Sequence, residues 1–143
     1  MQQVDLTPDD AAELTALFAE YGWWAERTES DVREALANSV AVGIREDGEL
    51  VAAARVLTDG VYYAKLYDVI VAADRRGEGI GSRLLDAVFD HPALDGVFLA
   101  VTCREGLVDF YERAGFEPYP SPVERPDGAP EEMCHLFRRG DDA

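Results

Sequence analysis

Residues 69–85 read Val-Ile-Val-Ala-Ala-Asp-Arg-Arg-Gly-Glu-Gly-Ile-Gly-Ser-Arg-Leu-Leu. This stretch joins a β-branched run, a glycine-rich loop and the start of an apolar-periodic segment, which predicts a strand, a tight loop and a helix. Gly77, Gly79 and Gly81 leave backbone N–H groups uncovered, and the helix dipole adds partial positive charge at the same place. The stretch therefore predicts a site for an anion such as a phosphate or a pyrophosphate.

Two common glycine motifs do not match this loop. A dinucleotide fingerprint needs G-x-G-x-x-G, whereas the glycines here are spaced G-x-G-x-G. A P-loop needs Gly-Lys-Ser/Thr, and the loop contains no lysine. A flexible turn that opens an ordinary helix is the alternative that glycine spacing alone leaves open.

The charge of the chain is strongly negative. The formal net charge is −16 over 143 residues, with 13 basic residues against 29 acidic ones. Nucleic acid would be repelled by such a surface, so we expect no nucleic-acid partner. A heavily hydrated acidic surface suits concentrated salt, and we hypothesise a halophilic source; a mesophile with an acidic proteome is the alternative.

Apolar runs, cysteines and histidines limit the class of protein further. No run approaches the roughly 18 apolar residues of a membrane helix, and acidic and amide residues interrupt any signal-peptide core near the N-terminus. Cys103 and Cys134 are read as reduced thiols, and His91 and His135 are isolated, so no metal site is expected. We expect a cytoplasmic protein with no membrane partner.

Hydrophobic periodicity and turn residues predict one α/β (α+β) domain over residues 1–143, with the order β-α-α-β-β-β-α-β-α-β-β. Its sheet is expected to be mixed and mostly antiparallel, with helices on both faces. Thr7-Pro8 and Ser30 are read as the starts of the first two helices. Further helices are predicted over 79–89 and 106–114, and strands over 40–45, 50–57, 61–71 (with a bulge or bend midway), 97–102 and 133–138.

The chain resembles the GNAT superfamily of acyl-CoA-dependent N-acetyltransferases in two motifs. Arg76, Gly79 and Gly81 fill the pattern R-x-x-G-x-G/A, and residues 111–116 read Tyr-Glu-Arg-Ala-Gly-Phe, similar to the family's Tyr-Glu-x-x-Gly-Phe helix ending. The predicted element order is also the order of that family. The resemblance implies a GNAT fold with splayed central strands and acetyl-CoA as the cosubstrate, without a metal.

The resemblance implies a set of coenzyme contacts on the glycine loop, on the strand before it and after the next strand. These residues are Val69, Ile70, Val71, Arg76, Gly77, Glu78, Gly79, Ile80, Gly81, Ser82 and Arg104. Two positions depart from the family pattern. Arg104 stands where many members have an asparagine, and Ala72-Ala73 lacks a frequent proline.

Two residues are candidates for proton transfer. The resemblance implies that Tyr111 protonates the leaving thiolate, the alternative being a half-buried helix residue. Asp68 precedes Val69 in an apolar strand, and it is the first candidate for the base that takes a proton from the attacking amine. It could instead face out of the sheet or bind an arginine such as Arg55; Glu105, Asp109 and water are weaker or further candidates.

The acceptor pocket is expected near Trp23 and Trp24, which could hold an amine by cation–π contact together with Asp68; core packing of one tryptophan is the alternative. Cys103 is read as a small apolar strand residue rather than an acyl carrier. We expect transfer of an acetyl group to the primary amine of a small molecule. A protein or peptide acceptor, or a non-catalytic acyl-CoA-binding module, are the alternatives, and a homodimer is left open.

The halophile hypothesis predicts that unfolding depends on salt. We expect the chain to be more stable in about 2 M than in about 0.1 M KCl, because screening shortens the reach of repulsion between its carboxylates. Denaturant unfolding in the two salts measures the difference. Equal free energies of unfolding would contradict the hypothesis.

Overall fold

The computed structural model describes residues 1–140. These residues divide into two compact units, Met1–Val108 and a second unit that begins at Asp109, and each is described by itself. The expectation of one domain over residues 1–143 stays a prediction.

The first unit contains a five-stranded sheet with the strand order β1-β2-β3-β4-β5. All neighbours are antiparallel except β4 and β5, which are parallel, so the prediction of a mixed, mostly antiparallel sheet is confirmed. The five strands are β1 (Gln2–Asp5), β2 (Val40–Glu46), β3 (Glu49–Thr58), β4 (Tyr63–Val71) and β5 (Phe98–Val101). Asp47 and Gly48 have positive φ angles of 52° and 80° in the β2–β3 turn, as an Asp-Gly hairpin requires.

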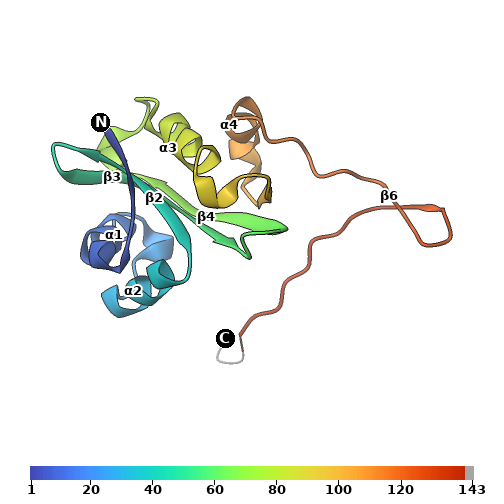
Figure 1. Ribbon diagram of the computed structural model, residues 1–143, viewed down its shortest axis with the longest axis horizontal. Helices are drawn as coiled ribbons and strands as arrows, with labels where there is room; N and C mark the ends of the chain where they lie inside the picture. The colour runs from blue at the N-terminus through green and yellow to red at the C-terminus, as the bar shows by residue number, and fades with distance from the viewer. Residues whose placement is uncertain (141–143) are drawn as a thin grey trace. The chain divides into compact units, whose positions relative to one another are not determined.

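Helices cover both faces of this sheet (Figure 1). Helices α1 (Ala11–Phe18) and α2 (Glu29–Ala37) lie on one face, and α3 (Ile80–Phe89) lies on the other. The α1/α2 face buries one apolar cluster: Leu6, Ala11, Leu14, Leu17, Phe18, Val32, Leu36, Ala41, Leu50, Ala53, Ile70 and Ala72. On α3, Ile80, Leu84, Leu85 and Val88 are at most 1% exposed, and each buried side chain of this size contributes about 1.5–3 kcal/mol.

The starts of the first two helical segments are capped by threonines. Thr7 forms a capping box with Asp10 at the 3-10 turn η1 (Pro8–Asp10), as the Thr7-Pro8 pair predicted. The expectation that Ser30 caps α2 is wrong: Thr28 does so, because it has the extended backbone that a cap needs and its hydroxyl accepts from the Asp31 N–H at 3.2 Å.

A β-bulge interrupts β4, as the long strand predicted. Ala53 pairs with Ile70 while Arg55 pairs with Tyr67, so two residues of β4, Asp68 and Val69, face the single residue between them on β3. Asp68 has a φ of 55°, in the left-handed region that non-glycine residues seldom adopt. The bulge turns the Asp68 side chain out of the strand's regular alternation.

The second unit begins within α4 (Val108–Arg113) and contains a two-stranded hairpin. Gly115 follows the helix with a φ of 111°, a left-handed backbone that suits a glycine just past a helix end. The hairpin pairs β6 (Val123–Glu124) with β7 (Pro130–Glu131), in a range for which the sequence analysis names no strand. The expected strand over 133–138 is wrong: residues 132–140 lie in no strand, and Leu136 and Phe137 are 93% and 82% exposed.

Residues 1–140 contain neither a candidate membrane-spanning helix nor a candidate metal site. No helix in this range combines the length and the hydropathy needed to cross a bilayer. No group of three or more His, Cys, Asp or Glu side chains is arranged to hold a metal ion within the same residues, and Cys103 and Cys134 are free thiols.

Candidate functional site

The glycine loop leads directly into α3 through two left-handed residues. Gly77 and Gly79 both have a φ of 80°, which a residue with a side chain would adopt only under strain. Gly79 is the N-cap residue of α3, so Ile80, Gly81 and Ser82 form the first turn of the helix. The loop therefore needs glycine for its backbone at positions 77 and 79.

The N-terminus of α3 has no side-chain cap and no acidic residue in its first turn. The starts of η1 and α2 differ, because Thr7 and Thr28 each accept a backbone N–H there. The backbone N–H groups of the first turn of α3 are thus left for another acceptor, and the helix dipole favours an anion in that place. This uncapped helix end is the feature of the first unit that suits a phosphate group.

Arg75 neutralises one negative charge beside the glycine loop. Its guanidinium pairs with Glu78 at 3.1 Å and with Glu46 on β2. The hydrogen bonds that Arg75 donates to Glu78 and then to Glu46 raise the pKa of Arg75 above its usual value, so it stays protonated. Because the Glu78 carboxylate is bound to Arg75, Glu78 offers an anion its backbone rather than its side chain.

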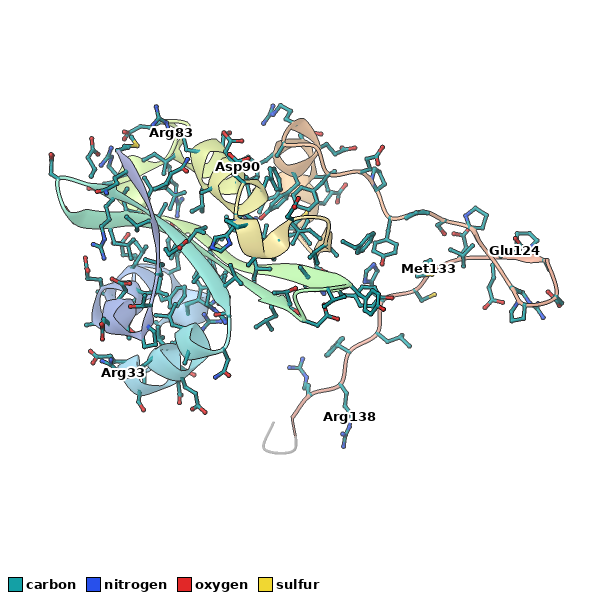
Figure 2. All side chains as sticks on the ribbon, viewed as in Figure 1. Arg33, Arg83, Asp90, Glu124, Met133 and Arg138 are labelled. Carbon is teal, nitrogen blue, oxygen red and sulfur yellow. The ribbon has the colours of Figure 1, made fainter. Side chains whose placement is uncertain are left out.

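Arg76, the arginine of the predicted coenzyme motif, is held by Tyr21 (Figure 2 shows all described side chains). Its Nε donates to the Tyr21 hydroxyl at 2.9 Å, and its guanidinium carbon lies 4.8 Å from the centre of the tyrosine ring. The same hydroxyl donates to the Val71 carbonyl at 2.6 Å, and the neighbouring Glu20 accepts the Ala73 N–H at 2.8 Å. The residues that follow α1 therefore fix both ends of the segment between β4 and the loop.

Sequence reasoning missed this role of Tyr21, which was not among the candidate site residues. Fifty residues separate Tyr21 from Val71, and no local spacing signals a contact of that range. The Tyr21 side chain is partly buried and packs against the α1/α2 cluster. Its hydroxyl partners depend on the tertiary structure alone.

The second half of β4 has a strand neighbour on one side only. β5 pairs with β4 from Tyr63 to Leu66, and β5 ends at Val101. Within the described residues, positions 67–71 therefore pair with β3 alone, and their other edge has no strand beside it. Val69 and Val71 are half-buried and Ile70 is buried, so this open edge lies just before the glycine loop.

Two arginines bind the carboxylate of Asp68. Arg27 donates from Nη1 to Oδ2 at 2.8 Å and from Nη2 to Oδ1 at 3.1 Å. Arg55 donates to Oδ2 from Nε at 2.8 Å, and its Nη2 lies 2.7 Å from the same oxygen as an ion pair. The structure thus has the arginine partner that the sequence left open as an alternative to a base, and it adds Arg27 as a second one.

Trp23 and Trp24 form the 3-10 turn η2 (Gly22–Trp24) with different environments. Trp23 is 68% exposed, whereas Trp24 packs against the α1/α2 cluster and lies 5.6 Å beneath the guanidinium of Arg27. One tryptophan is packed and the other exposed, as the core-packing alternative described. Their predicted contact with the acceptor stays a prediction.

The remaining candidates lie beyond β4. Arg104 is exposed and precedes the 3-10 turn η5 (Glu105–Leu107), where its carbonyl accepts the Leu107 N–H at 2.9 Å. Tyr111 lies in the second unit, on α4, and is buried, with its ring centre 5.5 Å from that of Phe116. The N–H of Phe116 donates to the Tyr111 carbonyl at 3.1 Å, which closes the helix end.

The comparisons of this chain with known proteins agree with one another. Residues 6–116 match the model of the acetyltransferase (GNAT) family. A solved structure from Xanthomonas campestris pv. campestris, assigned to that family, has a TM-score of 0.71 at 29% identity, over 87% of this chain and 93% of its own. A structure from Deinococcus radiodurans R1, assigned as an acetyltransferase, has a TM-score of 0.68 at 27% identity, over 87% of both chains.

A curated relative is serotonin N-acetyltransferase 2, chloroplastic, from Oryza sativa subsp. japonica, which is 30% identical over 120 residues. The match covers 80% of this chain but only 60% of the relative, so the chain spans well under the whole length of that enzyme. The family model alone matches far more than half of the chain, and the sheet order and the glycine loop agree with it. The chain belongs to the GNAT family of acetyltransferases.

Proposed function

We propose that this protein transfers an acetyl group from acetyl-CoA to the primary amine of a small molecule, by direct attack within a ternary complex. One observation carries the proposal: an uncapped helix N-terminus follows two left-handed glycines, beside a half-strand whose outer edge is open. The members of the GNAT family are acetyltransferases that typically use acetyl-CoA, and this chain belongs to that family.

The pyrophosphate of the coenzyme would bind to the backbone N–H groups of residues 76–82. The absence of a side-chain cap on α3 supports this, since an anion would satisfy the first-turn N–H groups of the helix. The Arg76 guanidinium, held over Tyr21, would add positive charge at the loop entrance. Arg104, where many family members have an asparagine, remains a further candidate contact.

The pantetheine arm would lie along Val69–Val71 and form main-chain hydrogen bonds like an added strand. The open edge of β4 beyond Leu66 supports this placement. A backbone N–H near Val69 or Ile70 would then polarise the thioester carbonyl as charge develops on its oxygen.

The reaction would need no nucleophilic side chain. The amine nitrogen attacks the thioester carbon, the new C–N bond forms, and the C–S bond breaks with its electron pair left on sulfur. The nitrogen loses one proton and the thiolate gains one, for which Tyr111 is the proposed donor. Asp68 is a weaker candidate for the base than the sequence suggested, because its carboxylate already accepts four close contacts from arginines; water is the alternative.

A small-molecule acceptor is supported by the curated relative, whose name gives serotonin as its substrate. The exposed Trp23 offers an aromatic face beside the site, to which an aromatic amine could bind. A protein or peptide acceptor and a non-catalytic acyl-CoA-binding module are the alternatives to be tested.

A thiol-release assay with acetyl-CoA and a panel of amines tests the proposal. We expect turnover with at least one small amine, and mass spectrometry should find the acetyl group on its nitrogen. A peptide with a free N-terminus serves as the comparison acceptor. Binding of acetyl-CoA without turnover of any amine or peptide would instead favour the binding module.

Replacing Tyr21 by Phe tests the coenzyme loop. The change removes the hydroxyl that holds Arg76 and the Val71 carbonyl but keeps the ring beneath the guanidinium. We expect the Kd for coenzyme A, measured by calorimetry, to rise about three- to tenfold, in line with the loss of one or two hydrogen bonds. Tyr62→Phe, on the exposed β3–β4 turn, is the control; an unchanged Kd in Tyr21→Phe would show that the loop does not depend on this contact.

Replacing Tyr111 by Phe tests the proposed proton donor. We expect kcat to fall about tenfold to a hundredfold, because general acid catalysis is lost, while the Kd for coenzyme A changes little. Steady-state kinetics with the best amine, together with the thermal midpoint of unfolding, separate this from misfolding. An unchanged kcat would remove Tyr111 from the mechanism.

A further inference from the structure

Arg27 and Arg55, here called the arginine pair, both bind Asp68, and the cluster of these three side chains has a net positive charge. Two guanidinium groups face one carboxylate, and the Asp68 side chain is only 7% exposed. The chain as a whole carries a formal charge of −16, so a positive cluster at the β4 bulge stands against the general charge of the protein. Its members come from β3, from β4 and from the segment between η2 and α2.

Asp68 is closely surrounded by arginine donors. Its Oδ2 lies 2.7 to 2.8 Å from three arginine nitrogens, and its Oδ1 accepts from a fourth at 3.1 Å. A carboxylate has about four acceptor positions, two on each oxygen, so the arginines leave at most one position, on Oδ1. An ammonium brought to this place would have to share the Oδ1 atom with Arg27 and would be repelled by the excess positive charge.

Arg27, by contrast, keeps donor capacity. A guanidinium has five N–H donors, and Arg27 has no hydrogen bond from its Nε. Within residues 1–140 no buried side-chain nitrogen or oxygen lacks a partner, so the Nε of Arg27 is in reach of solvent. Its side chain is 34% exposed, compared with 14% for Arg55.

The guanidinium of Arg27 is also held in one position. It lies 4.6 Å from the centre of the Phe18 ring and 5.6 Å from that of Trp24, while Asp68 binds both of its terminal nitrogens. An ordered, charged and solvent-reached donor loses little entropy when it binds an anion, and the planar guanidinium suits a carboxylate.

The arginine pair lies next to the strand half that the proposed function gives to the coenzyme. Asp68 directly precedes Val69 in the chain. Trp24 packs under Arg27, and the centre of the exposed Trp23 ring lies 5.5 Å from the centre of the Trp24 ring. We propose that the acceptor carries a carboxylate beside its amine and that Arg27 binds this carboxylate. The acceptor is then of the amino-acid class rather than a plain amine, an inference that rests on the proposed function.

Matched acceptor pairs that differ only in the carboxylate test this. Suitable pairs are tryptophan with tryptamine, 5-hydroxytryptophan with serotonin, and phenylalanine with phenethylamine, with tryptophan ethyl ester as a blocked carboxylate. We expect kcat/KM for the carboxylate-bearing member to exceed that of its partner about tenfold or more in at least one pair, and the ester to behave like the plain amine.

Arg27→Gln should abolish this preference. We expect kcat/KM for the carboxylate-bearing acceptor to fall about tenfold or more, with the plain amine unchanged or improved and the Kd for coenzyme A unaltered. Because the change in preference is compared between two proteins, differences in amine basicity within a pair cancel. Arg27→Lys, which keeps the charge but loses the planar fork, should lie between the two.

Arg33→Gln is the matched control, since it removes the same charge from an exposed arginine on the side of α2 that faces away from the sheet (Figure 2). It should change neither acceptor class. The midpoint of unfolding for each variant checks folding, and Arg55 still binds Asp68 when Arg27 is replaced.

The outcomes separate the two proposals. Turnover in which every plain amine equals or exceeds its carboxylate-bearing partner would overturn the anion site and keep the acetyltransferase. An equal loss for both members of a pair in Arg27→Gln would likewise assign Arg27 a purely structural role. If no acceptor is turned over, but calorimetry shows that only the carboxylate-bearing member binds to the coenzyme A complex, the anion site stands and the proposed reaction is wrong. If there is neither turnover nor such binding, both proposals are wrong.

Discussion

The contact between Asp68 and two arginines is the interaction on which the rest of this site depends. Asp68 holds a left-handed backbone in the middle of a strand, at a φ of 55°, which costs about 1–3 kcal/mol for a residue with a side chain. Four close contacts to guanidinium nitrogens offset that cost and keep the bulge in one geometry. The bulge in turn sets the course of β4 just before the glycine loop.

The value of this ion cluster lies in position more than in stability. A buried ion pair gains little over apolar packing once desolvation is counted, but the removal of one partner is costly because a charge is left unpaired. Here the cluster joins the consecutive strands β3 and β4 to the segment before α2, and Arg27 in that segment lies 41 residues from Asp68 in the chain. The Asp68 carboxylate thus links the segment after η2, the turn that contains Trp23 and Trp24, to the strand that leads into the glycine loop.

The loop itself shows the opposite use of polar groups. The starts of η1 and α2 are closed by Thr7 and Thr28, whereas the first turn of α3 has no cap. An N-cap contributes about 1 kcal/mol, so the chain forgoes that stabilisation where an anion can supply it. Tyr21 and Glu20 stabilise the same segment from outside, through the Val71 carbonyl and the Ala73 N–H.

The local sequence pattern predicted most helices and strands of the first unit, and the predictions that were wrong in either unit have physical causes. The strands over 40–45 and 50–57 and the helix over 79–89 agree with the structure to within a residue or so, because their apolar periodicity matches the faces that they bury. Ser30 was wrong by two residues because capping depends on backbone angles as well as on residue type. The strand over 133–138 was wrong because a pattern indicates suitability for a sheet, whereas a strand also needs a neighbour to pair with.

The sequence by itself determined the glycine loop, the mixed sheet and the family, since glycine spacing and hydrophobic period are properties of neighbouring residues. The tertiary structure alone decided which groups Asp68, Arg76 and Tyr21 meet, because those contacts join segments 13 to 55 residues apart. The same carboxylate that looked available as a base is bound by two arginines. The physical reason is that the pairing of charges depends on distance in space, which the order of residues along the chain does not contain.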